Sequence, residues 1–148
     1  MKSKAKEIKK IVREGYAKVA TQNGSCCSGG CSCGSAPRVE DISKAVGYSI
    51  DDINAVPKGA NLGLGCGNPV ALASLKEGEV VLDLGSGAGF DAFLAARQVG
   101  NNGHVIGVDM TPEMLAKARS HAASHGFGQV EFRLGEIEHL PVADNSVD

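Results

Sequence analysis

The segment EVVLDLGSGAGF at residues 79–90 limits the possible folds of this 148-residue chain more than any other segment. A continuous apolar run that is rich in β-branched residues and ends in glycines is typical of a buried parallel strand that turns sharply into a helix. The same pattern then repeats: the sequence predicts strands over 79–86, 104–110 and 129–136, and helices over 88–100 and 112–126. This alternation predicts an α/β fold with a doubly wound, mostly parallel sheet and right-handed crossovers.

The first 76 residues predict helices that are joined by loops. A helix over 2–20 is expected to pack its apolar stripe on the body of the protein, with lysines opposite; the stripe consists of Ala5, Ile8, Ile11, Val12, Tyr16 and Val19. Shorter helices are expected at 38–47, opened by Pro37, at 49–55 and at 69–75. Starts of helices are predicted by Ser49 with Asp52, by Asn68–Pro69 and by Thr111–Pro112–Glu113.

The carboxyl end stops at LPVADNSVD, where a fourth strand is expected to begin. Three parallel strands with two crossover helices make half of a doubly wound sheet. We therefore expect a helical extension over 1–76 and the first half of a ligand-binding domain over 77–148. By this interpretation the 148 residues are the amino-terminal portion of a longer enzyme and are inactive alone.

Charge and hydropathy exclude several classes of function. The net charge of −2 and the lack of a long apolar run argue against nucleic-acid binding and against a membrane protein. Residues 1–20 are basic, with seven basic and two acidic side chains, but they resemble neither a secretory signal nor a transit peptide. We expect a cytoplasmic protein, in which thiols stay reduced and serve as ligands or nucleophiles.

The turn after the first strand has glycines at alternate positions. It reads D-x-G-x-G-x-G from Asp83 to Gly89, and the sixth position counted from Gly85 is Phe90, so the dinucleotide fingerprint G-x-G-x-x-G is absent. Alternate glycines let a ligand lie against the main chain at the carboxyl edge of the sheet. The second strand ends in Asp109, which is placed to accept hydrogen bonds from ribose hydroxyls.

Four of the five cysteines lie in the segment GSCCSGGCSCG, residues 24–34. Their spacing, C-C-x₃-C-x-C, offers enough thiolates for zinc or copper(I) but is not the C-x₂-C pairing of structural zinc sites. The fifth, Cys66, lies between two glycines before an expected helix start, where the helix dipole favours a thiolate. A small buried cysteine in a tight loop is the alternative for Cys66.

The glycine turn and the acidic end of the second strand resemble motif I and the following acidic position of class I methyltransferases, which use S-adenosyl-L-methionine and have a Rossmann-like fold. The segment GEIEHLPVADNSVD resembles the part of that superfamily that contacts the adenine. The resemblance implies a cofactor site in which Asp109 binds the ribose, Met110 flanks the adenine, and Glu136 and Ile137 recognise its edge. It also implies that the methionine and ribose end is lined by Asp83, Gly85, Ser86, Gly87 and Gly89.

Together, NLGLGCGNP and the glycine turn resemble the microbial arsenite methyltransferases. In that family cysteine thiolates hold As(III), and its lone pair attacks the cofactor methyl group, so that no general base is needed. Cys66 matches one of the arsenic-binding cysteines, and Cys26 with Cys27 matches an assisting pair, while Cys31 and Cys33 have no counterpart. The resemblance further implies a monomer that detoxifies arsenite or its thiol conjugates, with thioredoxin or glutathione as the reductant.

Two other functions are compatible with the sequence. One is a class I methyltransferase that acts on a small organic acceptor of the quinone or sterol type. The other is a thiolate metal-binding module built on the cysteine loop. The sequence leaves two roles possible for each of two further residues. Asp91 either forms a hydrogen bond near the cofactor or is an ordinary helix residue. Tyr16 either forms part of a lid over the cofactor or packs on the core.

Overall fold

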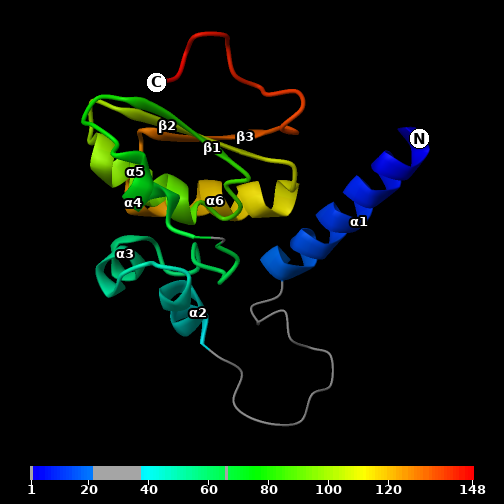
Figure 1. The fold of residues 1–148 in the computed structure, drawn as a ribbon, viewed down its shortest axis with the longest axis horizontal. Coiled ribbons are helices and arrows are strands. Elements are labelled where there is room, and N and C mark those ends of the chain that lie inside the picture. The colour runs from blue at the N-terminus through cyan, green and yellow to red at the C-terminus, as the bar shows by residue number, and fades with distance from the viewer. Residues whose placement is uncertain (1, 22–37, 66) are drawn as a thin grey trace.

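A parallel three-stranded sheet forms the centre of the computed structural model, which describes residues 2–21, 38–65 and 67–148. The strands β1 (Val80–Leu84), β2 (His104–Asp109) and β3 (Val130–Leu134) are hydrogen-bonded in the order β1-β2-β3. The helices α5 (Phe90–Val99) and α6 (Pro112–His125) connect them and lie on the same face of the sheet (Figure 1). The predicted Rossmann-like α/β fold is confirmed, and in the described part of the chain helices cover one face of the sheet.

The core lies between the sheet and these two helices. The ring of Phe93 on α5 is fully buried and contacts the rings of Phe127 and Phe132 at centroid distances of 4.7 and 5.7 Å. Gly107 of β2 makes room for Phe132, because a Cβ at that position would lie 2.6 Å from the ring. The site at the ends of the strands is thus built on a packed aromatic layer.

The prediction of a fully buried first strand is wrong for β1. Its residues are half-buried, and Leu84 is 51% exposed. The cause is its position at the edge of the described sheet, with one face covered by helices. At that edge the Asp148 N–H donates to the Val80 carbonyl, and the Val80 N–H donates to Asp148 Oδ2, both at 2.9 Å.

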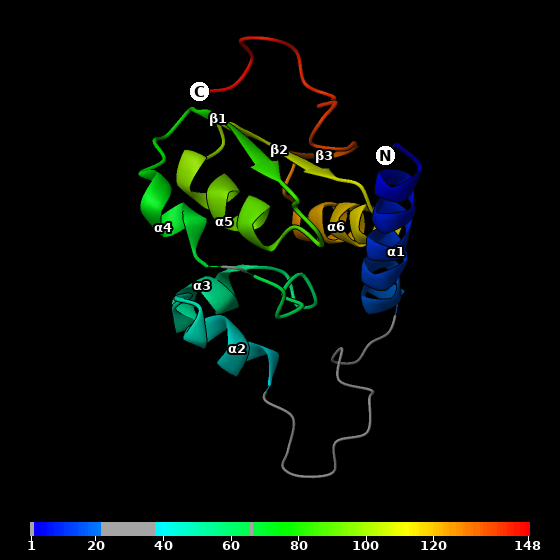
Figure 2. The same cartoon turned by 45° about the vertical axis from the view of Figure 1, so that its right-hand side comes forward.

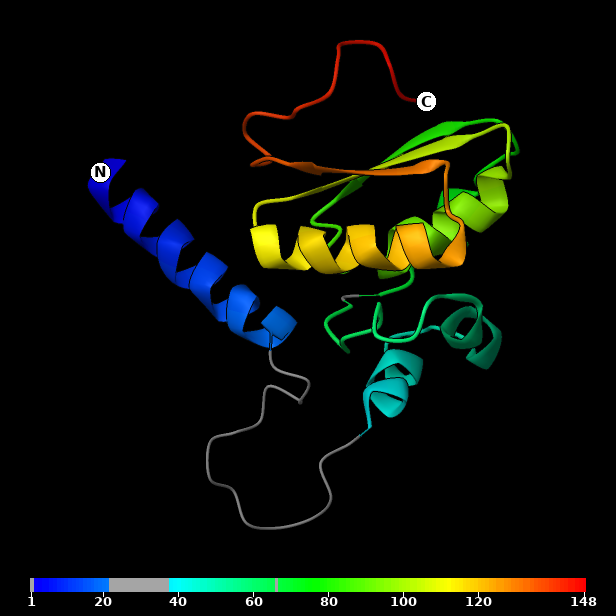
Figure 3. The ribbon, with the colours of Figure 1, turned by 180° about the vertical axis from the view of Figure 1, so that it is seen from behind.

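The helix α1 (Lys2–Thr21) packs differently from the prediction. Its carboxyl end contacts α6 through Ala20, which is buried with Met114, while Ile8 and Ile11 are 52% and 63% exposed. Figure 3 shows α1 as a separate rod beside the amino end of α6. Val19 of the predicted stripe packs against this contact of Ala20 with Met114, so the expected packing is confirmed at the carboxyl end of the helix and is wrong for Ile8 and Ile11.

The short helices α2 (Val39–Ala45) and α3 (Ile50–Ala55) form the lower part of the view in Figure 2, on the helix side of the sheet, and α4 (Pro69–Ala73) lies beside α5. The predicted capping pair is confirmed: Ser49 and Asp52 exchange backbone-to-side-chain hydrogen bonds of 3.0 and 2.9 Å. Asn68 also caps α4 as predicted, by accepting the Ala71 N–H.

One predicted cap is wrong. Although α6 begins at Pro112, the side chain of Thr111 makes no capping hydrogen bond there. That side chain is buried, and the Thr111 backbone N–H instead donates to Asp109.

Within the described residues, no helix is long and apolar enough to cross a bilayer.

Candidate functional site

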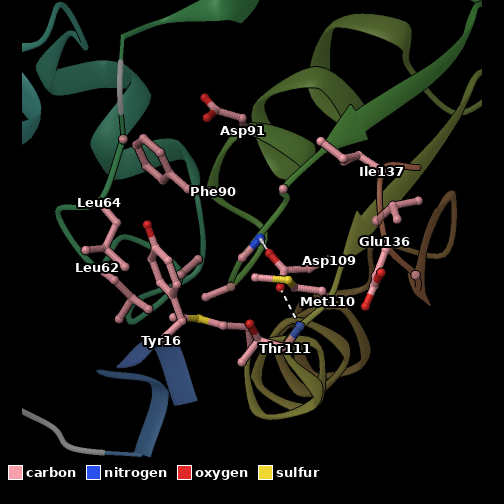
Figure 4. Close-up of a pocket in the computed structure, with 18 of the residues that line it drawn as sticks. Tyr16, Leu62, Leu64, Phe90, Asp91, Asp109, Met110, Thr111, Glu136 and Ile137 are labelled. Atoms are coloured by element: carbon pink, nitrogen blue, oxygen red, sulfur yellow. Dashed lines mark hydrogen bonds between the residues drawn. The ribbon is translucent and has the colours of Figure 1, made fainter. Parts of the chain in front are cut away.

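A cavity of about 420 Å³ opens at the carboxyl ends of β1 and β2. The glycine turn, the residues after β2 and the residues after β3 form one side, and α1 with the loop before α4 forms the other (Figure 4). Its lining falls in residues 9 and 16, 60–65, 85–91, 108–114 and 135–138. Ligands of open α/β sheets bind at this edge, so the cavity is the candidate site.

The glycine turn leaves its backbone open toward the cavity. Gly85 and Gly87 have φ angles of +77° and +52°, and a Cβ added to either would meet no atom within 4 Å. The N–H groups of Gly85 and Ser86 donate to the Val108 carbonyl at 2.7 and 3.1 Å, which fixes the turn against the end of β2. A ligand can therefore lie directly against this main chain.

Asp109 lies at the centre of the site in Figure 4, close to Met110 and Thr111. Its Oδ2 accepts the Gly87 N–H at 3.0 Å and its Oδ1 accepts the Thr111 N–H at 2.7 Å. Both oxygens of an ionised carboxylate have further acceptor capacity, so Asp109 can still receive hydrogen bonds from hydroxyl groups of a ligand. The two backbone bonds hold the carboxylate in one orientation at the cavity wall.

The turn after β3 supplies the opposite end of the cavity. The Gly135 N–H donates to the Asp109 carbonyl at 3.1 Å, and Glu136 pairs with His139 in an isolated antiparallel bridge. Glu136 and Ile137 both line the cavity, as the resemblance implied. Lys9 of α1 reaches this turn and lies 2.6 Å from Glu136 Oε2 and 2.8 Å from Glu138 Oε1.

Three residues of the expected cofactor set lie beside the cavity rather than on its wall: Asp83, Ser86 and Gly89. Gly89 is packed underneath, where a Cβ would lie 2.7 Å from Phe93 and 2.8 Å from Phe132. Ser86 is buried, and its hydroxyl has no hydrogen-bond partner among the described residues.

Asp83 has an unusual electrostatic environment. Burial, reinforced by the negative charges of Asp91 and Asp109, raises the pKa of Asp83 to about 7. Its Oδ2 is shielded from solvent and has no hydrogen-bond partner in the described part of the chain. A buried carboxyl of this kind is neutral for part of the physiological pH range.

Sequence reasoning missed several residues of the site, among them Lys9, Leu62, Leu64 and Tyr48. The Tyr48 hydroxyl lies 2.8 and 3.0 Å from the two carboxylate oxygens of Asp91, and its ring lies against Gly65 and Phe90. Burial raises the pKa of Asp91, and the hydrogen bond from Tyr48 opposes that rise. No local pattern could reveal a pair that is 43 positions apart.

Tyr16 and Asp91 were each open between two roles, and both line the cavity. In Figure 4 the ring of Tyr16 lies next to Leu62 and Leu64, across the cavity from Glu136. Tyr16 is 46% exposed, so it does not serve as a core residue.

All five cysteines lie outside the described residues, at positions 26, 27, 31, 33 and 66. The roles of Cys26, Cys27 and Cys66 therefore remain predictions. Among the residues that are described, no group of three or more histidines and carboxylates could hold a metal ion.

The described residues offer the kinds of groups that an adenosine-type ligand needs. The open backbone at Gly85 and Gly87 leaves room for the ligand, and Asp109 offers carboxylate oxygens at the centre. Met110 and Ile137 supply apolar surface for a flat base, beside the carboxylate of Glu136. These are the groups that S-adenosylmethionine requires: acceptors for hydroxyl and amino groups, and an apolar slot for the purine.

Comparisons with known proteins agree with this geometry. The model of the methyltransferase domain family matches residues 75–148. An arsenite methyltransferase of Halobacterium salinarum is 56% identical over 96% of this chain, which covers 38% of that protein. One of Aquipseudomonas alcaligenes is 47% identical over 57% of this chain and 26% of its own length.

A solved structure carries the same fold. It is a SAM-dependent methyltransferase from Aquifex aeolicus, with a TM-score of 0.52 and 27% identity, covering 76% of this chain and 55% of that one. The chain thus spans well under two thirds of the length of the relatives that it matches.

Proposed function

The chain belongs to the methyltransferase domain family, and from this premise we propose that it binds S-adenosylmethionine as part of an enzyme that methylates trivalent arsenic. The observation that carries the proposal is the cavity at the carboxyl ends of the strands, with its open glycine backbone and the fixed carboxylate of Asp109. The 56% identity to an arsenite methyltransferase over 96% of the chain supports arsenic as the acceptor.

In this proposal the residues divide the cofactor between them. Asp109 accepts hydrogen bonds from the ribose hydroxyls, Met110 and Ile137 enclose the adenine, and Glu136 accepts a hydrogen bond from its amino group. Gly85 and Gly87 allow the methionine part to approach the backbone, with Asp83, Ser86 and Gly89 supporting the turn. S-adenosylmethionine supplies an electrophilic methyl group.

The arsenic part of the proposal rests on cysteines. Cys66 is the proposed thiolate ligand of As(III), with Cys26 and Cys27 as assisting ligands. Cys66 directly follows Gly65 and lies seven residues after Gly59. Thiolates suit a soft, thiophilic centre. The arsenic lone pair forms the As–C bond as the S–C bond breaks, so arsenic is formally oxidised to As(V) and a thiol reductant must return it to As(III).

Further parts of the proposal concern the setting of the reaction. The reductant is a thioredoxin or glutathione, the arsenic enters as arsenite or as its thiol conjugate, and the enzyme acts in the cytoplasm as a monomer. Arsenic detoxification is the proposed biological role. The reductant and the cytoplasmic setting follow from a thiol-dependent chemistry, which needs a compartment that keeps cysteines reduced. The monomeric state and the biological role rest on the resemblance to the arsenite methyltransferases.

The test measures transfer of a labelled methyl group from S-adenosylmethionine to arsenite, with a thiol reductant, by the full-length protein that carries this chain. We expect methylated arsenicals from the wild type and at least a hundredfold lower rate from Cys66→Ser, with unchanged binding of S-adenosylhomocysteine. Cys31→Ser is the matched control and should keep most of the rate. Methylation of a quinone but not of arsenite, or an unaffected Cys66→Ser variant, would contradict the arsenic assignment.

A further inference from the structure

The amino-terminal half of α1 is tied to the cavity by one side chain. The Nζ atom of Lys9 lies 2.6 Å from Glu136 Oε2 and 2.8 Å from Glu138 Oε1, across 127 positions of sequence in the first case. The other end of α1 is held by Ala20, whose carbonyl accepts a hydrogen bond from Lys117 and whose side chain is buried beside Met114. The two attachment points are about 16 Å apart along the helix.

The contact of Lys9 with the turn after β3 does little for the stability of the fold. The side chains of Lys9, Glu136 and Glu138 are 32%, 38% and 52% exposed, and ion pairs of such exposure contribute little net free energy. The adjacent residues Ile8 and Ile11 are exposed and add no packing to the described part of the chain. A purely structural role is therefore a poor explanation for a lysine that faces two carboxylates at a cavity wall.

The geometry gives Lys9 a different task. Glu136 lines the cavity, and its turn is fixed to the sheet through the Gly135 N–H and the Asp109 carbonyl. The backbone of the turn is thus anchored, whereas the half-exposed carboxylate can rotate toward solvent unless a partner holds it. Lys9 binds Oε2, which fixes the direction in which the carboxylate group presents its acceptors.

We propose that Lys9 is a positioning residue for base recognition: by holding Glu136, it makes the site select a purine with a 6-amino group over one with a 6-oxo group. The inference rests on the proposed binding of S-adenosylmethionine and goes beyond it. An ionised carboxylate accepts hydrogen bonds and donates none, so it pairs with an amino group and repels a carbonyl oxygen. The selectivity depends on the carboxylate pointing at the base, which is what Lys9 provides.

The experiment compares S-adenosylhomocysteine with its inosine analogue, S-inosylhomocysteine, by titration calorimetry on the full-length protein. Lys9→Met keeps the apolar stem of the side chain and removes the ammonium group. We expect it to weaken binding of the adenosine compound about five- to tenfold and to leave the weak binding of the inosine compound unchanged. Lys9→Arg should restore most of the difference.

Lys10→Met is the matched control, because Lys10 is the next residue on α1 and forms only an exposed pair with Glu14 at 3.9 Å within the described chain. It should bind both compounds as the wild type does. In a double-mutant cycle, Lys9→Met should have no further effect on selectivity once Glu136→Gln is present, because the two residues act as one unit.

Equal weakening of both compounds by Lys9→Met would mean a merely structural role and would overturn the inference. So would a Lys9→Met variant that keeps wild-type selectivity. A wild-type protein that binds neither compound would instead overturn the proposed function, and the inference with it. The wild-type titration therefore separates a failure of the proposed function from a failure of the inference, which only the Lys9→Met titrations test.

Discussion

The two walls of the cavity are built on opposite principles. The glycine turn is held by backbone hydrogen bonds to the end of β2 and rests on the buried rings of Phe93 and Phe132. The helix α1 is held by a few contacts, one at Lys9 in its amino-terminal half and others around Ala20 at its carboxyl end, and it leaves Ile8 and Ile11 exposed. The difference teaches that one wall is set by the packing of the core, whereas the other can adjust without disturbing the sheet.

The largest loss of stability is expected from a substitution at Gly89, where the wall formed by the glycine turn meets the core. Gly89→Ala combines a φ angle of +95° with a Cβ 2.7 Å from Phe93 and 2.8 Å from Phe132. We expect the free energy of unfolding to fall by roughly 2–4 kcal/mol. Urea denaturation measures this fall.

Gly85→Ala is the control for that prediction. Its φ angle is +77°, but no atom lies within 4 Å of the added Cβ, so it should cost only the backbone strain of roughly 1–2 kcal/mol. If Gly89→Ala and Gly85→Ala lost equal stability, the contacts of Gly89 with Phe93 and Phe132 would not be what makes the wall with the glycine turn more rigid than α1.

A smaller effect is expected from Asp83, which lies behind the same wall. Because burial raises its pKa to about 7 from 3.8, the unfolded chain ionises this group first as the pH rises. The fold therefore loses stability between about pH 4 and pH 7, and the loss is complete above pH 7. Asp83→Asn should be equal to the wild type near pH 4 and more stable by about 1–3 kcal/mol at pH 8.

Thermal or urea unfolding over this pH range checks the prediction, with the exposed Asp144→Asn as the control. That variant should follow the wild type at every pH. An Asp83→Asn variant whose gain is the same at pH 4 and at pH 8 would mean that removal of the charge is not the cause.

The contrast between the wall with the glycine turn and the wall with α1 also explains which parts of the structure could be predicted from the sequence. The glycine turn and Asp109 could be placed because local patterns specify a strand, a turn and a helix, and parallel strands bring their ends together. The capping pair of Ser49 and Asp52 is equally local. The contacts of Lys9 with Glu136 and of Tyr48 with Asp91 join segments that are distant in the sequence. The pattern of apolar and polar residues around either partner does not predict them.

The packing of the apolar stripe of α1 was predicted wrongly at Ile8 and Ile11 for a related reason. A stripe of apolar residues indicates which face of a helix is apolar but not what will cover it. Here the buried contact is made by Ala20 at the helix end, with Val19 packed beside it, and a separate contact is made by the ammonium group of Lys9. The contact face therefore overlaps the apolar stripe at Val19 but leaves Ile8 and Ile11 exposed.

The smallest expected effect tests whether α1 is independent of the sheet. Gly15 lies inside α1, and a Cβ there would meet no atom within 4 Å, so Gly15→Ala should gain helix propensity without a clash, about 0.5–1 kcal/mol. Amide hydrogen exchange should show slower exchange in α1 and unchanged exchange in β1–β3. Gly128→Ala, which also meets no atom but lies outside any helix, should leave α1 unchanged. If the gain from Gly15→Ala spread to the strands, the two walls would be one cooperative unit, and Lys9 would couple the helix to the core rather than only orient Glu136.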